Sequence, residues 1–266
     1  MVLAQPQVVA SIRPLQLIAQ AVTQGVSVPG LVLDGTQDPH HPALRPSQRL
    51  LMDQADIFLW VGPQMETGFE RIIEELDAEA MAVQFMPGFT MLTLGDQVDP
   101  LFWLDTRNAA VIAELLATSL FIHDPDNAEV YQNNLAIFQD ELVRLEQEIK
   151  RIIDATSFPP FAVYHNGYQY FEKQFGLSHQ ASFTGSEEIL PGIRKVLEVK
   201  AILEASQVQC IVVDPTVNTA FLDSQLDIDT LHYASVDVIA QGGDSQEPSY
   251  VNFMRQFTAA FNACRQ

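Results

Sequence analysis

Long apolar runs are missing from this 266-residue chain. No stretch approaches the roughly 20 consecutive apolar residues that a membrane-spanning helix needs. Basic residues are also few, with 14 Lys and Arg against 34 Asp and Glu, and the formal net charge is −20. Nucleic acids and anionic membrane surfaces are bound through clustered Lys and Arg, so neither is an expected partner. The hydrophobic share of 47% is typical of a globular protein, and the length suffices for two modest domains.

Cysteine is nearly absent, and the two that occur, Cys210 and Cys264, are 54 residues apart. A zinc-binding pair needs close spacing, so this separation argues against one. A disulfide and two unpaired buried thiols stay open as equal alternatives. A bridge would place the protein in an oxidising compartment such as a periplasm, and closing this loop would contribute roughly 4 kcal/mol of stability.

Sequence signatures of several common active sites are absent as well. Neither a Gly-x-Ser-x-Gly nor a His-Glu-x-x-His motif occurs, and the only approach to a glycine-rich phosphate loop, at residues 241–244, is typical of a turn. The opening residues 1–5 are too short for a secretory signal, and we expect that a signal peptide has been removed. Soluble and lipid-anchored forms stay open as alternatives.

Short apolar segments alternate with helical patterns along most of the chain. This alternation predicts an α/β fold with two lobes, each a mostly parallel sheet covered by helices. The predicted strands are residues 8–12, 31–33, 57–62, 80–85, 161–164, 210–214 and 231–237. The predicted helices are residues 14–24, 46–54, 66–76, 167–175, 191–205 and 249–264.

One longer helix is predicted between the two halves, from about Asp126 to Asp154. Apolar residues recur along it at intervals of four and three, from Tyr131 to Ile152, which is a heptad stripe. A two-stranded coiled coil is one interpretation. We favour a strut packed along both lobes, because the heptads do not continue beyond this helix. The predicted domains are an N-terminal lobe at 1–125, a linking helix at 126–156 and a C-terminal lobe at 157–266.

Histidine is scarce, with six residues in the chain, yet three occur in phrases that follow predicted strands. His40 and His41 follow the second strand, and His165 follows the first strand of the second half. Ligands bind at the carboxyl ends of strands in open α/β sheets, and neutral imidazole is a common ligand for transition metals. Asp214 and Asp237 end two further strands, and each is a candidate carboxylate ligand or a helix cap.

Three longer phrases are more distinctive, namely PHHPALRPS at 39–47, WVGPQME at 60–66 and HNGYQYFEKQFGL at 165–177. In order and spacing, from Val8 to Cys264, the chain resembles the periplasmic solute-binding proteins of high-affinity zinc ABC importers. The resemblance implies two α/β lobes joined by a long rigid helix, with a metal held in the cleft between the lobes. It also implies a disulfide between Cys210 and Cys264.

The resemblance further implies a set of metal ligands. The first and third histidine ligands of the family fall on His40 and His165, and its late acidic ligand falls on Asp237. The second histidine is replaced, because Leu101 stands at its position in the phrase DPLFWLD. The histidine-rich acidic loop of the family is missing too.

Three protein ligands would leave an open coordination position on zinc. His41, Asp99, Asp105 and water are the candidates to complete the site. Since Leu101 cannot bind a metal, we expect a reduced affinity relative to a site with the full ligand set.

Three functions follow from these observations. The favoured one is a monomeric periplasmic binding protein, not inserted in the membrane, that carries Zn²⁺ (Mn²⁺ being less favoured) to the inner-membrane permease of an ABC importer. The second is a paralogue of that family with altered or lost metal binding. The third is a zinc hydrolase that uses the open position. An enzyme needs a general base near the metal, and Glu66, Glu187 and Glu188 are only loosely placed candidates. No nucleophile–base pair is visible in the sequence, so we expect no enzymatic activity.

Overall fold

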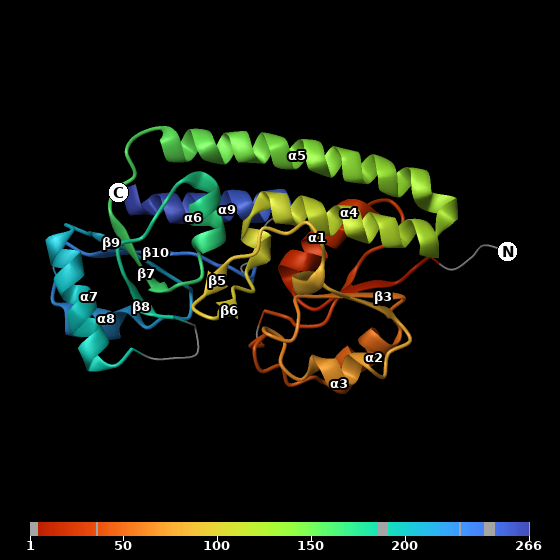
Figure 1. The fold of residues 1–266 in the computed structure, drawn as a ribbon, viewed down its shortest axis with the longest axis horizontal. Helices are drawn as coiled ribbons and strands as arrows, with labels where there is room; N and C mark the ends of the chain where they lie inside the picture. Colours follow the sequence, from red (N-terminus) through yellow and green to blue (C-terminus); the bar gives the residue numbers. More distant parts are fainter. Residues whose placement is uncertain (1–4, 36, 186–190, 229, 242–247, 266) are drawn as a thin grey trace. The chain divides into compact units, whose positions relative to one another are not determined.

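The computed structural model describes the chain except for residues 1–4, 36, 186–190, 229, 242–247 and 266 (Figure 1). The chain divides into two compact units that are assembled from separate segments. Unit 1 comprises Met1–Met91, Asp105–Leu145 and Ile239–Phe253, and unit 2 comprises Leu92–Leu104, Glu146–Val238 and Met254–Gln266. Each unit contains one four-stranded parallel sheet covered by helices, which confirms the predicted α/β class.

Unit 1 is built on a sheet with the strand order β2-β1-β3-β4, and all its pairings are parallel. Its strands are β1 (Val8–Ala10), β2 (Gly30–Leu31), β3 (Ile57–Trp60) and β4 (Glu79–Ala82). Its helices include α1 (Arg13–Thr23), α2 (Pro46–Asp53), α3 (Phe69–Ile73) and α4 (Thr106–His123). Every residue of β1 and β3 is buried, as is typical of parallel strands covered on both faces.

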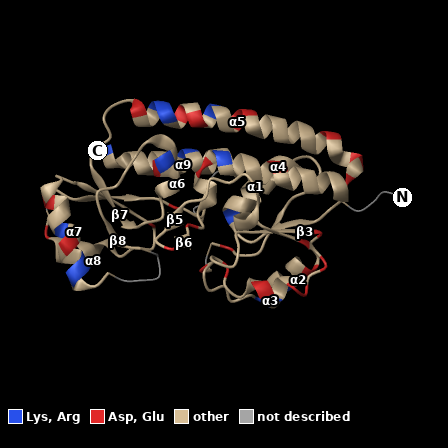
Figure 2. Cartoon of the chain, viewed as in Figure 1, with Lys and Arg blue, Asp and Glu red and all other residues tan. Residues whose placement is uncertain are grey.

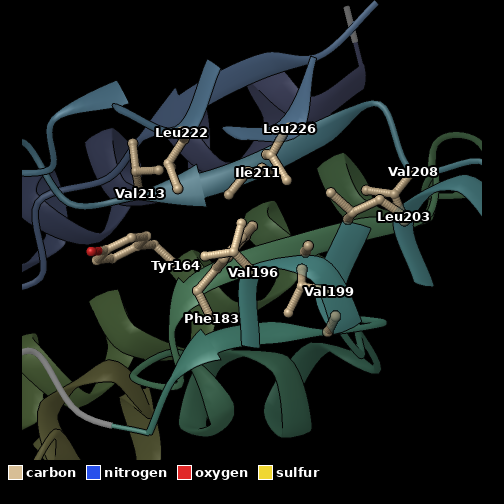
Figure 3. Packing of buried hydrophobic residues seen from close by; sticks show 12 residues of the cluster. Tyr164, Phe183, Val196, Val199, Leu203, Val208, Ile211, Val213, Leu222 and Leu226 are labelled. Atoms are coloured by element: carbon tan, nitrogen blue, oxygen red, sulfur yellow. The ribbon is translucent and has the colours of Figure 1, made fainter. Parts of the chain in front are cut away.

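Unit 2 repeats the design with the strand order β10-β9-β7-β8, again all parallel. Its strands are β7 (Phe161–His165), β8 (Ser182–Thr184), β9 (Cys210–Val213) and β10 (His232–Ser235), and a separate hairpin joins β5 (Thr93–Leu94) to β6 (Gln97–Val98). Its helices include α6 (Gln169–Phe175), α7 (Ile193–Ala205) and α8 (Thr219–Leu226). One face of the sheet packs against α7 and α8, where Ile211, Val196, Val199, Leu222 and Leu226 meet (Figure 3).

Two helices, α5 (Ala128–Asp154) and α9 (Tyr250–Asn262), contribute residues to both units. The heptad stripe of α5 is largely buried within this chain, at Tyr131, Phe138, Leu142, Leu145 and Ile149. This burial argues against a coiled coil with another chain, because the stripe is covered within its own chain. The predicted domain borders at residues 125 and 157 stay a prediction.

The structure corrects one predicted helix and confirms the predicted bridge. The helix expected at 66–76 is only Phe69–Ile73, because the chain turns at Gly68, whose φ is 92°. Cys210 and Cys264 form a disulfide, as the family resemblance implied. Among the described residues, none of the helices combines the length and the apolar character that crossing a membrane requires.

Candidate metal site

The loop that carries His40 and His41 leaves the carboxyl end of β2 in unit 1. Its backbone is fixed from two sides: Asp38 Oδ1 accepts a hydrogen bond from the His40 backbone N–H at 2.9 Å, and the Thr67 hydroxyl donates to the His40 carbonyl. Pro39 is buried, His40 is half-buried and His41 is exposed. The loop therefore holds the backbone of His40 firmly in place.

A buried carboxylate ties together the loops that follow β1 and β3. Glu66 accepts hydrogen bonds from the Ser11 hydroxyl, from the Gly62 N–H at 2.9 Å and from the Val61 N–H at 3.3 Å. Burial raises the pKa of Glu66 to about 7, although these hydrogen bonds oppose the shift. Both oxygens have structural partners and the side chain is fully buried, so Glu66 is not an accessible general base. Glu187 and Glu188, the other two candidates, lie outside the described residues.

His165 is the last residue of β7 in unit 2, and its side chain is 2% exposed. Side chains alternate along a strand, so Phe161, Val163 and His165 share the face opposite to the α7–α8 core. The ring of His165 lies 5.2 Å from that of Tyr168, between centroids, and its Nδ1 lies 3.4 Å from Oδ2 of Asp214.

Asp214 follows directly after β9, and its two carboxylate oxygens have different neighbours. Oδ1 accepts hydrogen bonds from the backbone N–H of Thr216, at 2.9 Å, and from its hydroxyl, whereas Oδ2 faces His165. Partial burial would raise the pKa of Asp214, but the interactions with His165 and Thr216 outweigh it and lower the pKa to about 2. The predicted helix cap is wrong here, because the N-cap of α8 is Asn218.

Leu101 lies beside the imidazole of His165. A Cβ atom placed on Gly167 would stand 2.8 Å from Nε2 of His165 and 3.0 Å from Cδ1 of Leu101, so both side chains approach the same side of Gly167. Leu101 is 6% exposed. The position that carries histidine in the resembled family is thus buried next to the ring edge with Nε2, and here it offers only methyl groups.

Asp99 holds the Leu101 loop in place. Its Oδ1 accepts a hydrogen bond from the Leu101 N–H at 3.0 Å, and its Oδ2 accepts one from Nε2 of Gln169 at 2.8 Å. Burial raises the pKa of Asp99 to about 6, while these hydrogen bonds and the nearby His165 lower it. Asp105 has structural partners of a similar kind, since it caps α4 and forms an ion pair with Arg107 at 2.6 Å.

Asp237 is half-buried and lies two residues after the end of β10, at the same carboxyl edge of the unit 2 sheet as His165. The indole of Trp103 donates a hydrogen bond to the Val238 carbonyl at 2.7 Å, which links the Leu101 loop to this segment. His40 and His41 belong to unit 1, whereas His165 and Asp237 belong to unit 2. Within the described part of the chain, no three His, Cys, Asp or Glu residues form a ready-made group for a metal, so the ligand set stays a prediction.

Comparison with known proteins gives consistent matches over nearly the whole chain. The model of the family described as "Zinc-uptake complex component A periplasmic" (ZnuA) matches residues 8–264. The high-affinity zinc uptake system protein ZnuA of Brucella abortus (strain 2308) is 27% identical over 254 residues, which cover 78% of this chain and 76% of that protein. A crystal structure of ZnuA superimposes with a TM-score of 0.83 at 20% identity, covering 98% of each chain. The Mn-bound periplasmic metal binding protein from Candidatus Liberibacter asiaticus shares the fold, with a TM-score of 0.81 at 16% identity over 97% of this chain and 98% of that one.

Proposed function

This chain belongs to the ZnuA family of periplasmic zinc-uptake components, and on that premise we propose that it captures Zn²⁺ with His40, His165 and Asp237. Proteins of this family are metal-binding solute-binding proteins and not enzymes, so the hydrolase alternative is abandoned. They work with the permease and ATPase of an ABC importer. We propose that this chain, as a monomer, delivers its metal to such a permease.

The surroundings of His165 are the observation that carries the proposal. The Asp214 carboxylate faces Nδ1 of His165, which leaves Nε2 as the nitrogen for a metal. Imidazole nitrogens suit Zn²⁺, whereas a site made of carboxylates and water suits Mn²⁺. His40 would supply a second imidazole from a loop with a fixed backbone, and Asp237 a carboxylate from the carboxyl edge of the unit 2 sheet. Water or His41 would take the fourth position.

Leu101 favours a second candidate, a family member with an altered metal preference. With one imidazole fewer, the site has a larger share of oxygen ligands, and this change moves its preference from Zn²⁺ towards harder ions such as Mn²⁺. The Mn-bound structural neighbour illustrates that a protein with this fold binds that ion. Parallel titrations with both metals therefore belong in the same experiment.

The test is a calorimetric titration of the metal-free protein with Zn²⁺ and with Mn²⁺. We expect one zinc ion per chain, and we expect His40→Ala and His165→Ala each to weaken binding by more than about 100-fold, because even a residue behind a ligand contributes about 10- to 100-fold. His123→Gln is the control, since His123 at the end of α4 pairs with Glu79 of β4, and this substitution should leave affinity unchanged. Absence of zinc uptake by the parent protein would refute the proposal, and tighter binding of Mn²⁺ would establish the second candidate.

A gain-of-affinity variant tests whether position 101 faces the metal. Leu101→His restores the imidazole of the family pattern next to His165, and we expect it to bind Zn²⁺ more tightly than the parent. If His41 fills the vacant ligand position in the parent, His41→Ala should weaken zinc binding by the parent. The same substitution should then have no effect on zinc binding in the Leu101→His background. Equal affinities of Leu101→His and the parent would mean that residue 101 does not contact the bound ion.

A further inference from the structure

The contact between Asp214 and His165 has a role that the ligand set alone does not assign. Asp214 is not among the proposed ligands, and its Oδ2 lies 3.4 Å from Nδ1 of a histidine that is 2% exposed. This distance is longer than that of an ideal N–H···O bond, about 2.9 Å, so the pair is a close charge contact rather than a short hydrogen bond. The pair therefore joins a proposed metal ligand to a carboxylate on the neighbouring strand.

We propose that Asp214 is a positioning residue that keeps the proton of His165 on Nδ1 and thereby leaves the lone pair of Nε2 for the metal. The inference rests on the proposed function only in taking His165 as a ligand. A neutral imidazole carries one N–H, and the group that faces one nitrogen decides which nitrogen keeps the proton. A carboxylate behind a metal-bound histidine also orients the ring and raises its basicity.

Strand register places the two side chains together. β7 and β9 pair with Val163 opposite Val212, and two further residues along each strand bring His165 opposite Asp214. Both residues point to the same face, because side chains alternate along both strands in step. The pairing is thus built into the sheet and does not depend on a surface loop.

The carboxylate has little freedom to turn away from the ring. Its Oδ1 is held by the backbone N–H and the hydroxyl of Thr216, so Oδ2 is the oxygen left to face His165. Asp99 also interacts electrostatically with His165, but its two oxygens accept hydrogen bonds from the Leu101 N–H and from Nε2 of Gln169. Of these two carboxylates, Asp214 is therefore the one with an oxygen that faces Nδ1 of His165.

The replacement of Asp214 by asparagine should reverse the preference of the His165 proton for Nδ1, with almost no change in the shape of the side chain at position 214. The amide oxygen can keep the hydrogen bonds with Thr216, which turns the NH₂ group towards Nδ1 of His165. An amide donor requires Nδ1 as the acceptor, so the proton moves to Nε2 and blocks the nitrogen that would bind the metal. We expect Asp214→Asn to weaken zinc binding by about 10- to 100-fold.

The deciding measurement is the tautomer of His165 in the metal-free protein, read from long-range ¹H–¹⁵N correlations at mildly alkaline pH. His165→Gln identifies the signals, which vanish in that variant. We expect the Nδ1–H form in the parent and in Asp214→Glu, which keeps a carboxylate, and the Nε2–H form in Asp214→Asn. Asp223→Asn removes the same charge elsewhere in unit 2, where Asp223 binds the Tyr233 hydroxyl, and should change neither tautomer nor affinity.

The outcome separates this inference from the proposed function. An unchanged Nδ1–H tautomer in Asp214→Asn, or an Nε2–H form in the parent, would overturn the positioning role whatever the zinc titration shows. A parent protein that binds no zinc would instead refute the proposed function, while the tautomer would still report whether Asp214 sets the proton of His165.

Discussion

Glu66 shows how a single buried carboxylate organises the unit 1 end that carries the His40 loop. It accepts hydrogen bonds from the ends of β1 and β3, and it lies next to Thr67, whose hydroxyl holds the His40 carbonyl. Gly62 is part of the same turn, with a φ of 141° and a Cβ position only 2.3 Å from the side chain of Gln84, so no larger residue fits. The turn at residues 61–67 therefore supports the backbone of the His40 loop, and none of its residues is among the proposed metal ligands.

The raised pKa of Glu66 predicts a pH dependence of stability. Because folding raises this pKa from 4.5 to about 7, the folded state favours the protonated acid, and its contribution to stability is full below pH 4.5 and lost as the pH rises through 7. Glu66→Gln cannot ionise, so we expect the variant to gain roughly 2–3 kcal/mol relative to the parent between about pH 5 and pH 8. Urea denaturation of the metal-free proteins at both pH values measures the difference.

Glu70→Gln, the same change at an exposed position of α3, is the control and should show no such gain. If the stabilities of Glu66→Gln and the parent change in parallel over this pH range, Glu66 is already ionised at low pH. The hydrogen bonds that it accepts would then lower its pKa by more than burial raises it.

At the scale of single residues, the sequence located side chains more readily than their contacts. His165, Asp214 and Asp237 were each predicted from their place after an apolar strand, and the structure puts them at the carboxyl edge of one sheet. The positioning role of Asp214 was missed, since it depends on β7 and β9 being neighbours in a given register. The sequence shows that each apolar run ends in a polar residue, but not which two runs lie side by side.

Among the elements, α5 illustrates why some were predicted closely. Its heptad stripe alternates with charged residues, so a helix with one buried side is the natural interpretation, and the observed helix ends at the predicted Asp154. By contrast, α4 was missed, because apolar residues and alanines surround most of it and leave no stripe to recognise. β8 was missed because its one apolar residue lies between Ser182 and Thr184, and α8 because only Leu222 and Leu226 of its eight residues are buried.

The register of α5 predicts that substitution of two neighbouring residues will affect stability to very different extents. Leu142 is 4% exposed and Val143 is 56% exposed. We expect Leu142→Ala to lower the free energy of unfolding by about 2–5 kcal/mol, because it leaves a cavity in the core. Val143→Ala is the matched control and should change stability by no more than about 0.5 kcal/mol. Chemical denaturation of both variants makes the comparison, and an equal or larger loss in Val143→Ala would contradict the assigned buried side of α5.

For the whole molecule, the charge is spread rather than gathered into one field. Acidic residues are interspersed with Lys and Arg towards the C-terminal end of α5 and occur on loops and helices of both units (Figure 2). A net charge of −20 distributed in this way keeps the protein soluble and attracts cations in general. Selectivity for one metal must therefore come from the ligands and not from the overall charge.

The disulfide between Cys210 and Cys264 is expected to stabilise the chain as a whole. It closes a loop of 54 residues, which corresponds to about 4 kcal/mol when the unfolded state is the one constrained. We therefore expect a reducing agent to lower the melting temperature of the parent by several degrees. A variant with both cysteines replaced by alanine should melt at the same temperature as the reduced parent. Adding the reducing agent should not change its melting temperature. Identical melting of reduced and oxidised parent would show that the bridge adds no stability.

Unit 1 is completed by residues 239–253, far along the chain from its first strand. The ring of Tyr250 packs edge-on against Phe138 of α5 at 5.9 Å, and Tyr250 is almost fully buried. A nascent chain therefore cannot close this core until nearly all of it has left the ribosome.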